Sequence, residues 1–228
     1  AEPIQGAGGV IVAPKGYHPA MARICQEYGV LYVADEVVTA FGRLGHFFAS
    51  EDVFGMVPDI ITAAKGMSSA YAPLSANIIS DEIYEVLSVP QASGAMFTHG
   101  FTYSGHPVCC AAGLKNIEIM EREDICGHVR RVGPYFEQRL RELSDLPLVG
   151  DVRGSHFMLC VENVANKNTK ELVAPEFAIG KRIADECQSR GVLVRPIAHL
   201  NVMSPPLTLD TDQVDHLVDV LGASIKEV

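Results

Sequence analysis

Residues 8–36 read GGVIVAPKGYHPAMARICQEYGVLYVADE, and this stretch decides the fold class. It contains a β-branched run over 8–13, apolar positions at helical spacing over 19–28, and a second apolar run over 30–34 that ends in Asp35. A strand, a helix and a strand in this order form a βαβ unit. Strands that are apolar throughout are typical of a parallel sheet covered by helices on both faces. We therefore predict an α/β protein with a mainly parallel sheet.

Two further apolar runs, over 60–64 and 76–79, predict additional strands of this sheet, and the first of them ends at Lys65. Asp35 and Lys65 would then terminate neighbouring strands. The carboxyl ends of such strands are where α/β proteins place their chemistry.

The second half of the chain has a different pattern. One long helical stretch over 107–143 is expected to break near Gly127 and at Gly133–Pro134, and shorter segments follow it. Those segments are predicted as strands over 156–161, 192–195 and 200–203, a helix over 176–189, and a closing helix over 212–226 that Thr211 or Asp210 caps. We therefore divide the chain into the remainder of a large domain (1–115), a linking helix region (116–145) and a small α+β domain (146–228).

Composition excludes several classes of partner. The 228 residues include 18 Lys and Arg against 28 Asp and Glu, which gives a net charge of −10. A negative field repels phosphates and acidic lipid heads, so we expect neither nucleic acid nor a membrane as partner. Hydrophobic residues make up 48% of the chain, which predicts a packed core. No run approaches the roughly 20 apolar residues of a membrane helix.

The cysteines and histidines point to no metal site. The six cysteines form no CxxC pair, and the eight histidines form no HxxxH or HExxH pattern. We therefore predict no disulfide framework and no bound metal. We expect a cytoplasmic protein whose thiols are buried and inert.

Lys65 and Asp35 each have two interpretations. Lys65 is either a solvated loop lysine or an amine held in a pocket, where it can form a Schiff base with a carbonyl compound. Asp35 is either a carboxylate that caps a turn or a functional group. A polar segment over 99–105 (HGFTYSG) is suited to wrapping an anion. An amine, a carboxylate and phosphate-binding hydroxyls are the groups that pyridoxal phosphate requires.

Four segments carry a resemblance to a known family. EPIQGAGG (2–9), ADEVVTAFGRLG (34–45), AAKGMSSAYAPLSA (63–76) and HGFTYSGHP (99–107) closely resemble the class III aminotransferases, which are fold type I enzymes that use pyridoxal phosphate. The FTYSGHP and SSAYAPL versions look most like the ω-amine:pyruvate branch. The resemblance implies that the chain corresponds to the C-terminal half of a longer protein, with part of the large-domain sheet and the small domain.

The resemblance assigns roles to individual residues. Lys65 matches the lysine that binds the cofactor and moves the substrate proton, and Asp35 matches the carboxylate paired with the pyridine nitrogen. Val37 matches the side chain that packs on the ring, and in an extended chain it would face the same way as Asp35. Thr102, with Phe101 beside it, matches the residue that donates to the cofactor phosphate of the neighbouring subunit. The resemblance thus implies a homodimer with shared active sites.

Substrate specificity depends on other positions. Val38 stands where ornithine-type members carry a glutamine, and Val202 stands where they carry an arginine that pairs with the glutamate matching Glu2. Both departures disfavour ornithine-type substrates. Arg195 lies at the distance from Pro205–Pro206 at which amine:pyruvate transaminases carry a mobile arginine. A guanidinium can hold a substrate carboxylate with two hydrogen bonds and swing away for an apolar amine. The alternative is a surface arginine of the small domain.

The sequence therefore predicts transamination between an amine or ω-amino acid and a keto acid such as pyruvate. Other class III activities remain open, namely transfer from 4-aminobutyrate, diamines, β-amino acids or taurine, or an aminomutase reaction. A truncated, non-catalytic dimerisation module is an alternative from another class. A nicotinamide-binding Rossmann domain has little support, because no GxGxxG follows any predicted strand.

Overall fold

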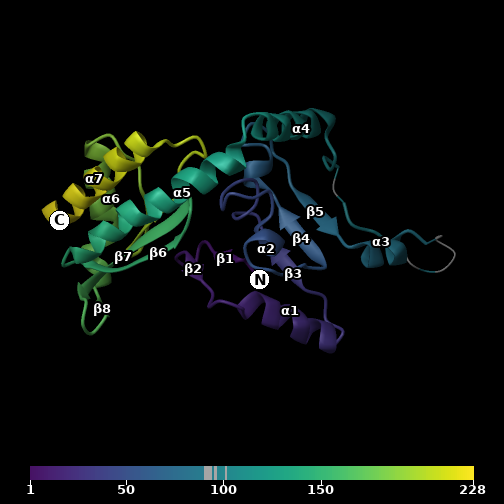
Figure 1. The fold of residues 1–228 in the computed structure, drawn as a ribbon, viewed down its shortest axis with the longest axis horizontal. Coiled ribbons are helices and arrows are strands. Elements are labelled where there is room, and N and C mark those ends of the chain that lie inside the picture. The colour runs from purple at the N-terminus through teal and green to yellow at the C-terminus, as the bar shows by residue number, and fades with distance from the viewer. Residues whose placement is uncertain (90–93, 95–96, 101) are drawn as a thin grey trace. The chain divides into compact units, whose positions relative to one another are not determined.

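The computed structural model describes residues 1–89, 94, 97–100 and 102–228. The chain folds into two compact units. Unit 1 comprises Ala1–Pro3, Ala13–Phe41 and His46–Asp124, and unit 2 comprises Ile4–Val12, Gly42–Gly45 and Ile125–Val228. Helix α4 (Pro107–Arg122) lies in unit 1, and α5 (Ile125–Arg141) begins the main part of unit 2 (Figure 1).

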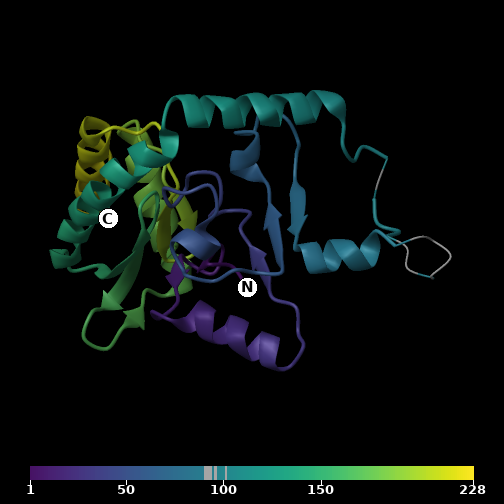
Figure 2. The same ribbon diagram turned by 45° about the vertical axis from the view of Figure 1, so that its right-hand side comes forward.

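Among the described residues, the sheet of unit 1 has three strands in the order β3-β4-β5, namely β3 (Val33–Asp35), β4 (Ile60–Ala63) and β5 (Ala76–Ile79) (Figures 1 and 2). Strands β3 and β4 are parallel, whereas β4 and β5 are antiparallel. The predicted strands over 30–34, 60–64 and 76–79 are therefore confirmed within a few residues. The α/β class is confirmed as well, with β5 as the reversed strand.

The outer edge of β3 is extended by the first residue of the chain. The Ala1 amino nitrogen donates to the Val33 carbonyl oxygen at 2.8 Å, and the Asp35 N–H donates to the Ala1 carbonyl oxygen at 2.9 Å. In a parallel pair of strands, one residue bonds to the two residues that flank its partner on the neighbouring strand. Ala1 therefore continues the parallel part of the sheet beside β3.

The predicted βαβ unit over 8–36 is wrong in its first strand. Strand β2 (Ile11–Val12) does not join β3; it pairs antiparallel with β1 (Ile4–Gln5). A glycine-rich turn reverses the chain between these strands, and Gly9 has a φ of 111°, which only glycine adopts readily. Helix α1 (Tyr17–Glu27) forms near the expected place.

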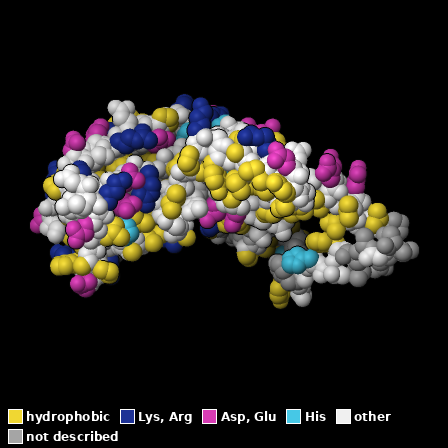
Figure 3. All heavy atoms as spheres, turned by 90° about the horizontal axis from the view of Figure 1, so that it is seen from below, with side chains coloured by type: hydrophobic (Ala, Val, Ile, Leu, Met, Phe, Trp, Pro, Cys, Tyr) yellow, Lys and Arg dark blue, Asp and Glu magenta, His cyan; other side chains and the backbone are white. Residues whose placement is uncertain are grey.

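The strands of unit 1 are less covered than their apolar sequence predicted. Helix α1 packs Met21, Ala22 and Cys25 against the cluster of Tyr32, Ala34 and Met56. Elsewhere the described helices leave apolar strand residues accessible, with Val33 37%, Ile78 41% and Ile79 36% exposed. Figure 3 shows hydrophobic side chains gathered on the face where α1 lies. Exposed side chains of α1 and the turn that follows it are Tyr17, Ile24, Tyr28, Val30 and Leu31.

The long helical stretch breaks at a different place from the one expected. Asp124, with a φ of 47°, separates α4 from α5. Helix α5 continues through Gly127, Gly133 and Pro134. Position 133 requires a glycine because the chain packs closely there: a Cβ would lie 2.9 Å from the Cα of His156. The glycine therefore marks a contact within the fold and not the end of a helix.

Short helices complete unit 1. These are α2 (Ala49–Asp52), the 3₁₀ turn η1 (Lys65–Met67) and α3 (Asp81–Leu87). The Ser80 hydroxyl accepts from the Ile83 N–H, so α3 begins at a serine cap.

Unit 2 is built on an antiparallel sheet in the order β6-β7-β10-β9, with β8 paired to β7. Its strands are β6 (Val149–Ser155), β7 (Met158–Asn166), β8 (Glu171–Leu172), β9 (Arg195–Ile197) and β10 (Leu200–Met203). Strand β10 has the predicted bounds. Strand β9 begins where the predicted strand over 192–195 ended, because Val194 turns into the core and the pairing with β10 starts at Arg195.

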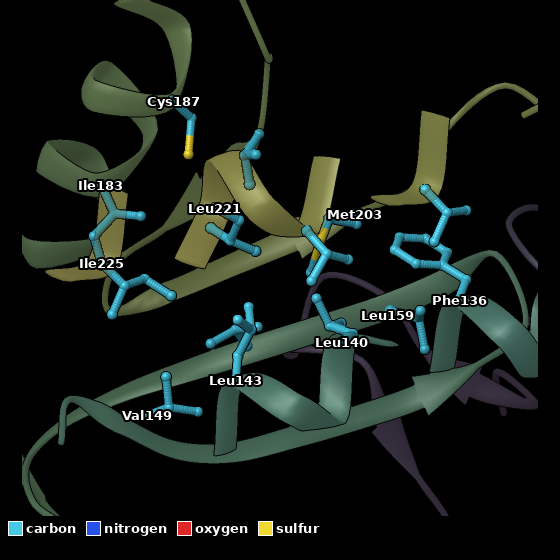
Figure 4. Close-up of a cluster of buried hydrophobic side chains, with 14 of the residues drawn as sticks. Phe136, Leu140, Leu143, Val149, Leu159, Ile183, Cys187, Met203, Leu221 and Ile225 are labelled. Atoms are coloured by element: carbon cyan, nitrogen blue, oxygen red, sulfur yellow. The ribbon is translucent and has the colours of Figure 1, made fainter. Parts of the chain in front are cut away.

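Helices α5, α6 (Ile179–Ser189) and α7 (Thr211–Glu227) enclose the core of unit 2 with the 3₁₀ turns η3 (Glu142–Asp145) and η4 (Pro175–Phe177). Figure 4 shows side chains from these helices and from the sheet in one cluster, among them Phe136, Leu140, Leu159, Ile183 and Leu221. Asp210 caps α7, as expected, through a capping box with Gln213.

The cysteines differ in burial. Cys160 and Cys187 are buried, and burial raises the pKa of both thiols, that of Cys160 to about 12. These two match the expected inert thiols. The other four cysteines are half-buried, so the expectation of burial is wrong for them because they lie on helix faces that the fold does not fully cover.

Candidate active site

Asp35 and Lys65 lie at one edge of the unit 1 sheet. The parallel register of β3 and β4 places Asp35 opposite Thr62, and Lys65 follows Thr62 by three residues. Both strands therefore deliver a charged side chain at their carboxyl ends, as predicted. The side chains of Asp35 and Lys65 are exposed. The Val37 N–H donates to Asp35 Oδ1 at 3.1 Å, and this bond holds the carboxylate against the turn.

Lys65 has an unusual backbone conformation. Its φ is 40°, in the left-handed region that non-glycine residues seldom adopt, and it opens the turn η1. Such a conformation costs on the order of 1–3 kcal/mol and persists only where the surroundings enforce it. Gly66 allows the necessary close approach, because a Cβ at this position would lie 2.8 Å from the Cβ of Phe41. The lysine therefore sits in a strained turn packed tightly against the segment that follows Asp35.

The loop after Asp35 is anchored by a carboxylate that the sequence analysis overlooked. Glu36 is fully buried. Its side chain accepts hydrogen bonds from the Ala49 N–H at 2.7 Å and the Ser50 N–H at 2.8 Å, and also from the hydroxyls of Thr39 and Ser50. Strand alternation could have indicated this role, since an acidic residue directly after an outward Asp35 points into the core and requires donors there.

We expect Glu36→Ala to destabilise unit 1. The substitution leaves two backbone N–H groups and two hydroxyls in a buried place without their acceptor, so the free energy of unfolding should fall by about 3 kcal/mol. Urea unfolding of the full-length protein measures this change. Glu51→Ala, on the exposed surface of α2, is the matched control and should change stability by about 0.5 kcal/mol or less. Equal effects of the two substitutions would show that the Glu36 contacts contribute nothing.

Val37 does not lie in an extended strand. It is half-buried and belongs to a turn, since the Ala40 N–H donates to the Glu36 carbonyl oxygen at 3.0 Å. Strand β3 ends at Asp35, so alternation along an extended chain does not apply to Val37. The argument from an extended chain therefore does not support a direction for Val37, and packing of Val37 on a cofactor ring stays a prediction.

The remaining predicted site residues lie apart in the chain. Thr102 is exposed and belongs to a turn shortly before α4, whereas Phe101 lies outside the described residues. Arg195 belongs to unit 2, where it opens β9 directly opposite Val202 of β10. It borders a cavity of about 300 Å³. The cavity is lined by Leu193, Arg195, Val202, Met203, Ser204, Pro205, Pro206 and Leu217.

Arg43 fixes one wall of that cavity, and the sequence analysis did not single it out. Its guanidinium donates to the carbonyl oxygens of Pro205 at 2.6 Å and of Phe157 at 3.1 Å. Burial lowers the pKa of Arg43 to about 10, so the side chain remains charged at neutral pH. The position within the GRLG sequence offered no signal for these contacts, because both partners lie more than a hundred residues further along.

The groups at the sheet edge suit pyridoxal phosphate. Lys65 offers an accessible primary amine for the aldehyde carbon, and Asp35 offers an accessible carboxylate for a protonated ring nitrogen. Within the described part of the chain, no three His, Cys, Asp or Glu side chains gather closely enough to hold a metal ion. Among the described helices, none is both long and apolar enough to cross a bilayer.

Comparisons with known proteins identify the family of this chain. The family model "Aminotransferase class-III" matches residues 1–225. Gamma-aminobutyrate transaminase 1 of Oryza sativa subsp. indica is 41% identical over 99% of this chain and 44% of its own length. The corresponding enzyme of Solanum lycopersicum is 39% identical over 100% of this chain and 44% of its own. The chain thus spans about half the length of these curated relatives.

Solved structures give the same result. An (S)-enantioselective ω-transaminase from Thermomicrobium roseum is 43% identical, with a TM-score of 0.93 over 100% of this chain and 50% of that one. An amine transaminase from an uncultivated Pseudomonas species, in its pyridoxal-phosphate-bound form, is 42% identical with a TM-score of 0.95, and the match covers 51% of it. The chain therefore belongs to the class III aminotransferases, a family of enzymes that depend on pyridoxal phosphate.

Proposed function

We propose that the full-length protein transfers an amino group between an amine or ω-amino acid and a keto acid such as pyruvate. The observation that carries the proposal is the accessible Lys65 amine in a left-handed turn, at the same sheet edge as the Asp35 carboxylate. When bound, pyridoxal phosphate supplies an electron sink for the pair left when the substrate carbon loses a proton. Lys65 would hold the cofactor, then take that proton and return it. Asp35 would keep a proton on the ring nitrogen.

The ω-amine:pyruvate specificity rests on the surroundings of Arg195. In the antiparallel pair of β9 and β10, Arg195 and Val202 are direct partners and so project on the same face of the sheet. Val202 is the position where ornithine-type members carry an arginine. Arg195 would therefore supply a guanidinium for the substrate carboxylate from the neighbouring strand. Its side chain is exposed, which leaves it room to move.

Arg195→Ala should separate two types of substrate. The loss of two charge-assisted hydrogen bonds predicts a rise in the KM for pyruvate of about tenfold to a hundredfold. The half-reaction with 1-phenylethylamine should change by less than about twofold, since this amine has no carboxylate to bind. Steady-state and single-turnover kinetics of the full-length protein measure both effects. Arg182→Ala, an exposed arginine of α6, is the control and should leave both unchanged. Equal losses for both substrates would assign Arg195 a structural role.

Transfer restricted to 4-aminobutyrate, one particular ω-amino acid, is the second and narrower candidate, because curated relatives are named gamma-aminobutyrate transaminases. A comparison of alanine formation from pyruvate with 1-phenylethylamine and with 4-aminobutyrate as donors decides between the two. Turnover of the aromatic amine supports the first proposal, and turnover of 4-aminobutyrate alone supports the second. Failure of both donors, with no bound cofactor, would indicate a non-catalytic dimerisation module.

We further propose a cytoplasmic homodimer in which Thr102 serves the phosphate site of the partner subunit. The exposed position of Thr102 in a turn supports this assignment. Dilution below the dimer dissociation constant should then release cofactor. A folded full-length monomer that retained its cofactor would contradict the shared site.

A further inference from the structure

We propose that Asn116 of α4 is a positioning residue that holds Lys65 in its left-handed turn. Its amide nitrogen donates to the carbonyl oxygens of Gly66 at 2.9 Å and Met67 at 3.1 Å. Its amide oxygen accepts from the Ser69 hydroxyl at 2.8 Å. One side chain thus binds three residues of the turn that starts at Lys65. The role rests on the proposed function, in which Lys65 carries the cofactor.

The amide is the chemical group that this position requires. Two carbonyl oxygens need donors, and one hydroxyl needs an acceptor. A carboxylate provides only acceptors at neutral pH, and a hydroxyl provides a single donor, whereas an asparagine provides two donors and an acceptor. Asparagine is also a poor residue for the interior of a helix. Its presence within α4 therefore indicates a contact outside the helix that outweighs the local preference.

The turn needs an anchor because it is strained. Lys65, Ser69 and Ala70 have φ values of 40°, 47° and 64°, so three non-glycine residues out of six are left-handed. Two of the backbone bonds within the turn are long, with the Ser68 N–H nitrogen 3.3 Å from the Lys65 carbonyl oxygen and the Ser69 nitrogen 3.4 Å from that of Gly66. Such a segment relaxes unless its neighbours hold it.

Helix α4 supplies a fixed support for this anchor. Figure 2 shows α4 running past the ends of β4 and β5, where the turn η1 lies. Gly113, one helical turn before Asn116, allows close packing, because a Cβ there would lie 2.5 Å from Leu74 Cδ2. Met120, one turn after Asn116, is buried. The helical turns before and after Asn116 are therefore both packed in place. Movement of the turn at Lys65 then requires breaking its hydrogen bonds to Asn116.

The test compares variants of the full-length protein titrated with pyridoxal phosphate. Asn116→Asp keeps the size and the acceptor for Ser69 but loses both donors to the turn. We expect cofactor affinity to fall at least about tenfold, since two hydrogen bonds near a strained segment are lost. At full occupancy, the visible absorption band of cofactor linked to lysine should also be weaker. Asn116→Ala removes all three bonds, although alanine itself favours the helix. This variant should show the same losses, and its apo form should still unfold cooperatively.

Two controls define the outcome. Ser69→Ala removes only the bond to the amide oxygen and should change affinity by less than about threefold. Asn168→Asp makes the same chemical change on an exposed loop and should have no effect. Wild-type affinity and absorption in both Asn116 variants, even with a lower melting temperature, would overturn the positioning role. Absence of the visible band in the wild-type protein would instead overturn the proposed function, and the role of Asn116 with it.

Discussion

Lys65→Ala is expected to abolish both the covalent attachment of pyridoxal phosphate and transamination. Lys65 follows β4 at the same end of the sheet as Asp35, and alanine has neither a nucleophile nor a base to replace its amine. The visible absorption band of lysine-linked cofactor and the rate of alanine formation measure the two losses.

The exposed lysine of α4 provides the matched control. Lys115 forms a surface ion pair with Glu118, and its replacement by alanine should leave both measurements near wild type. The Lys65→Ala protein should still fold, because its side chain is exposed and alanine removes no buried contact. Normal turnover in this variant would remove Lys65 from the mechanism.

Asp35→Asn is expected to reduce turnover by about a thousandfold, within the range found for groups that control a catalytic proton. The amide oxygen can still accept from the Val37 N–H, so the turn keeps its anchor. A neutral amide, however, cannot stabilise a protonated ring nitrogen. The electron sink would then be weaker at the step in which the substrate loses its proton. Single-turnover kinetics at saturating cofactor measure this loss separately from cofactor binding.

An exposed aspartate of the same unit tests whether charge alone matters. Asp81 lies in the first turn of α3, and Asp81→Asn should leave turnover unchanged. If Asp35→Asn retained nearly full activity at saturating cofactor, the pairing with the ring nitrogen would be wrong.

The parts of the fold predicted correctly depend on local signals. Runs of apolar residues with polar ends gave β4, β5 and β10 within one residue, because each run is short and bounded by turn residues. The same reading placed Asp35 and Lys65 at the ends of adjacent strands, and the register confirms that they share an edge. The family itself followed from motifs around these residues.

The parts predicted wrongly depend on contacts between distant residues. The apolar run over 8–13 pairs with β1, not β3, since the glycines before it turn the chain back. Gly133 lies inside α5 because His156, on the hairpin between β6 and β7, packs against it. Neither partner is visible in the local sequence.

The site residues that were missed share one property. Glu36 and Asn116 act through hydrogen bonds to backbone groups, and such partners leave no trace in a motif. The cost of burying a carboxylate next to a strand, or of placing an asparagine in a helix, could have drawn attention to them. The roles of Val37, Thr102 and Arg195 rest on the family resemblance and stay predictions.

Peptide mapping after borohydride reduction tests the central claim most directly. The full-length protein, saturated with pyridoxal phosphate, is reduced, digested and analysed by mass spectrometry. Reduction fixes the cofactor on the lysine that carries it, so the modified peptide identifies the nucleophile. The account predicts a single phosphopyridoxyl group on the peptide that contains Lys65, and its loss in Lys65→Ala. Modification of another lysine, or none at all in a folded protein, would contradict it.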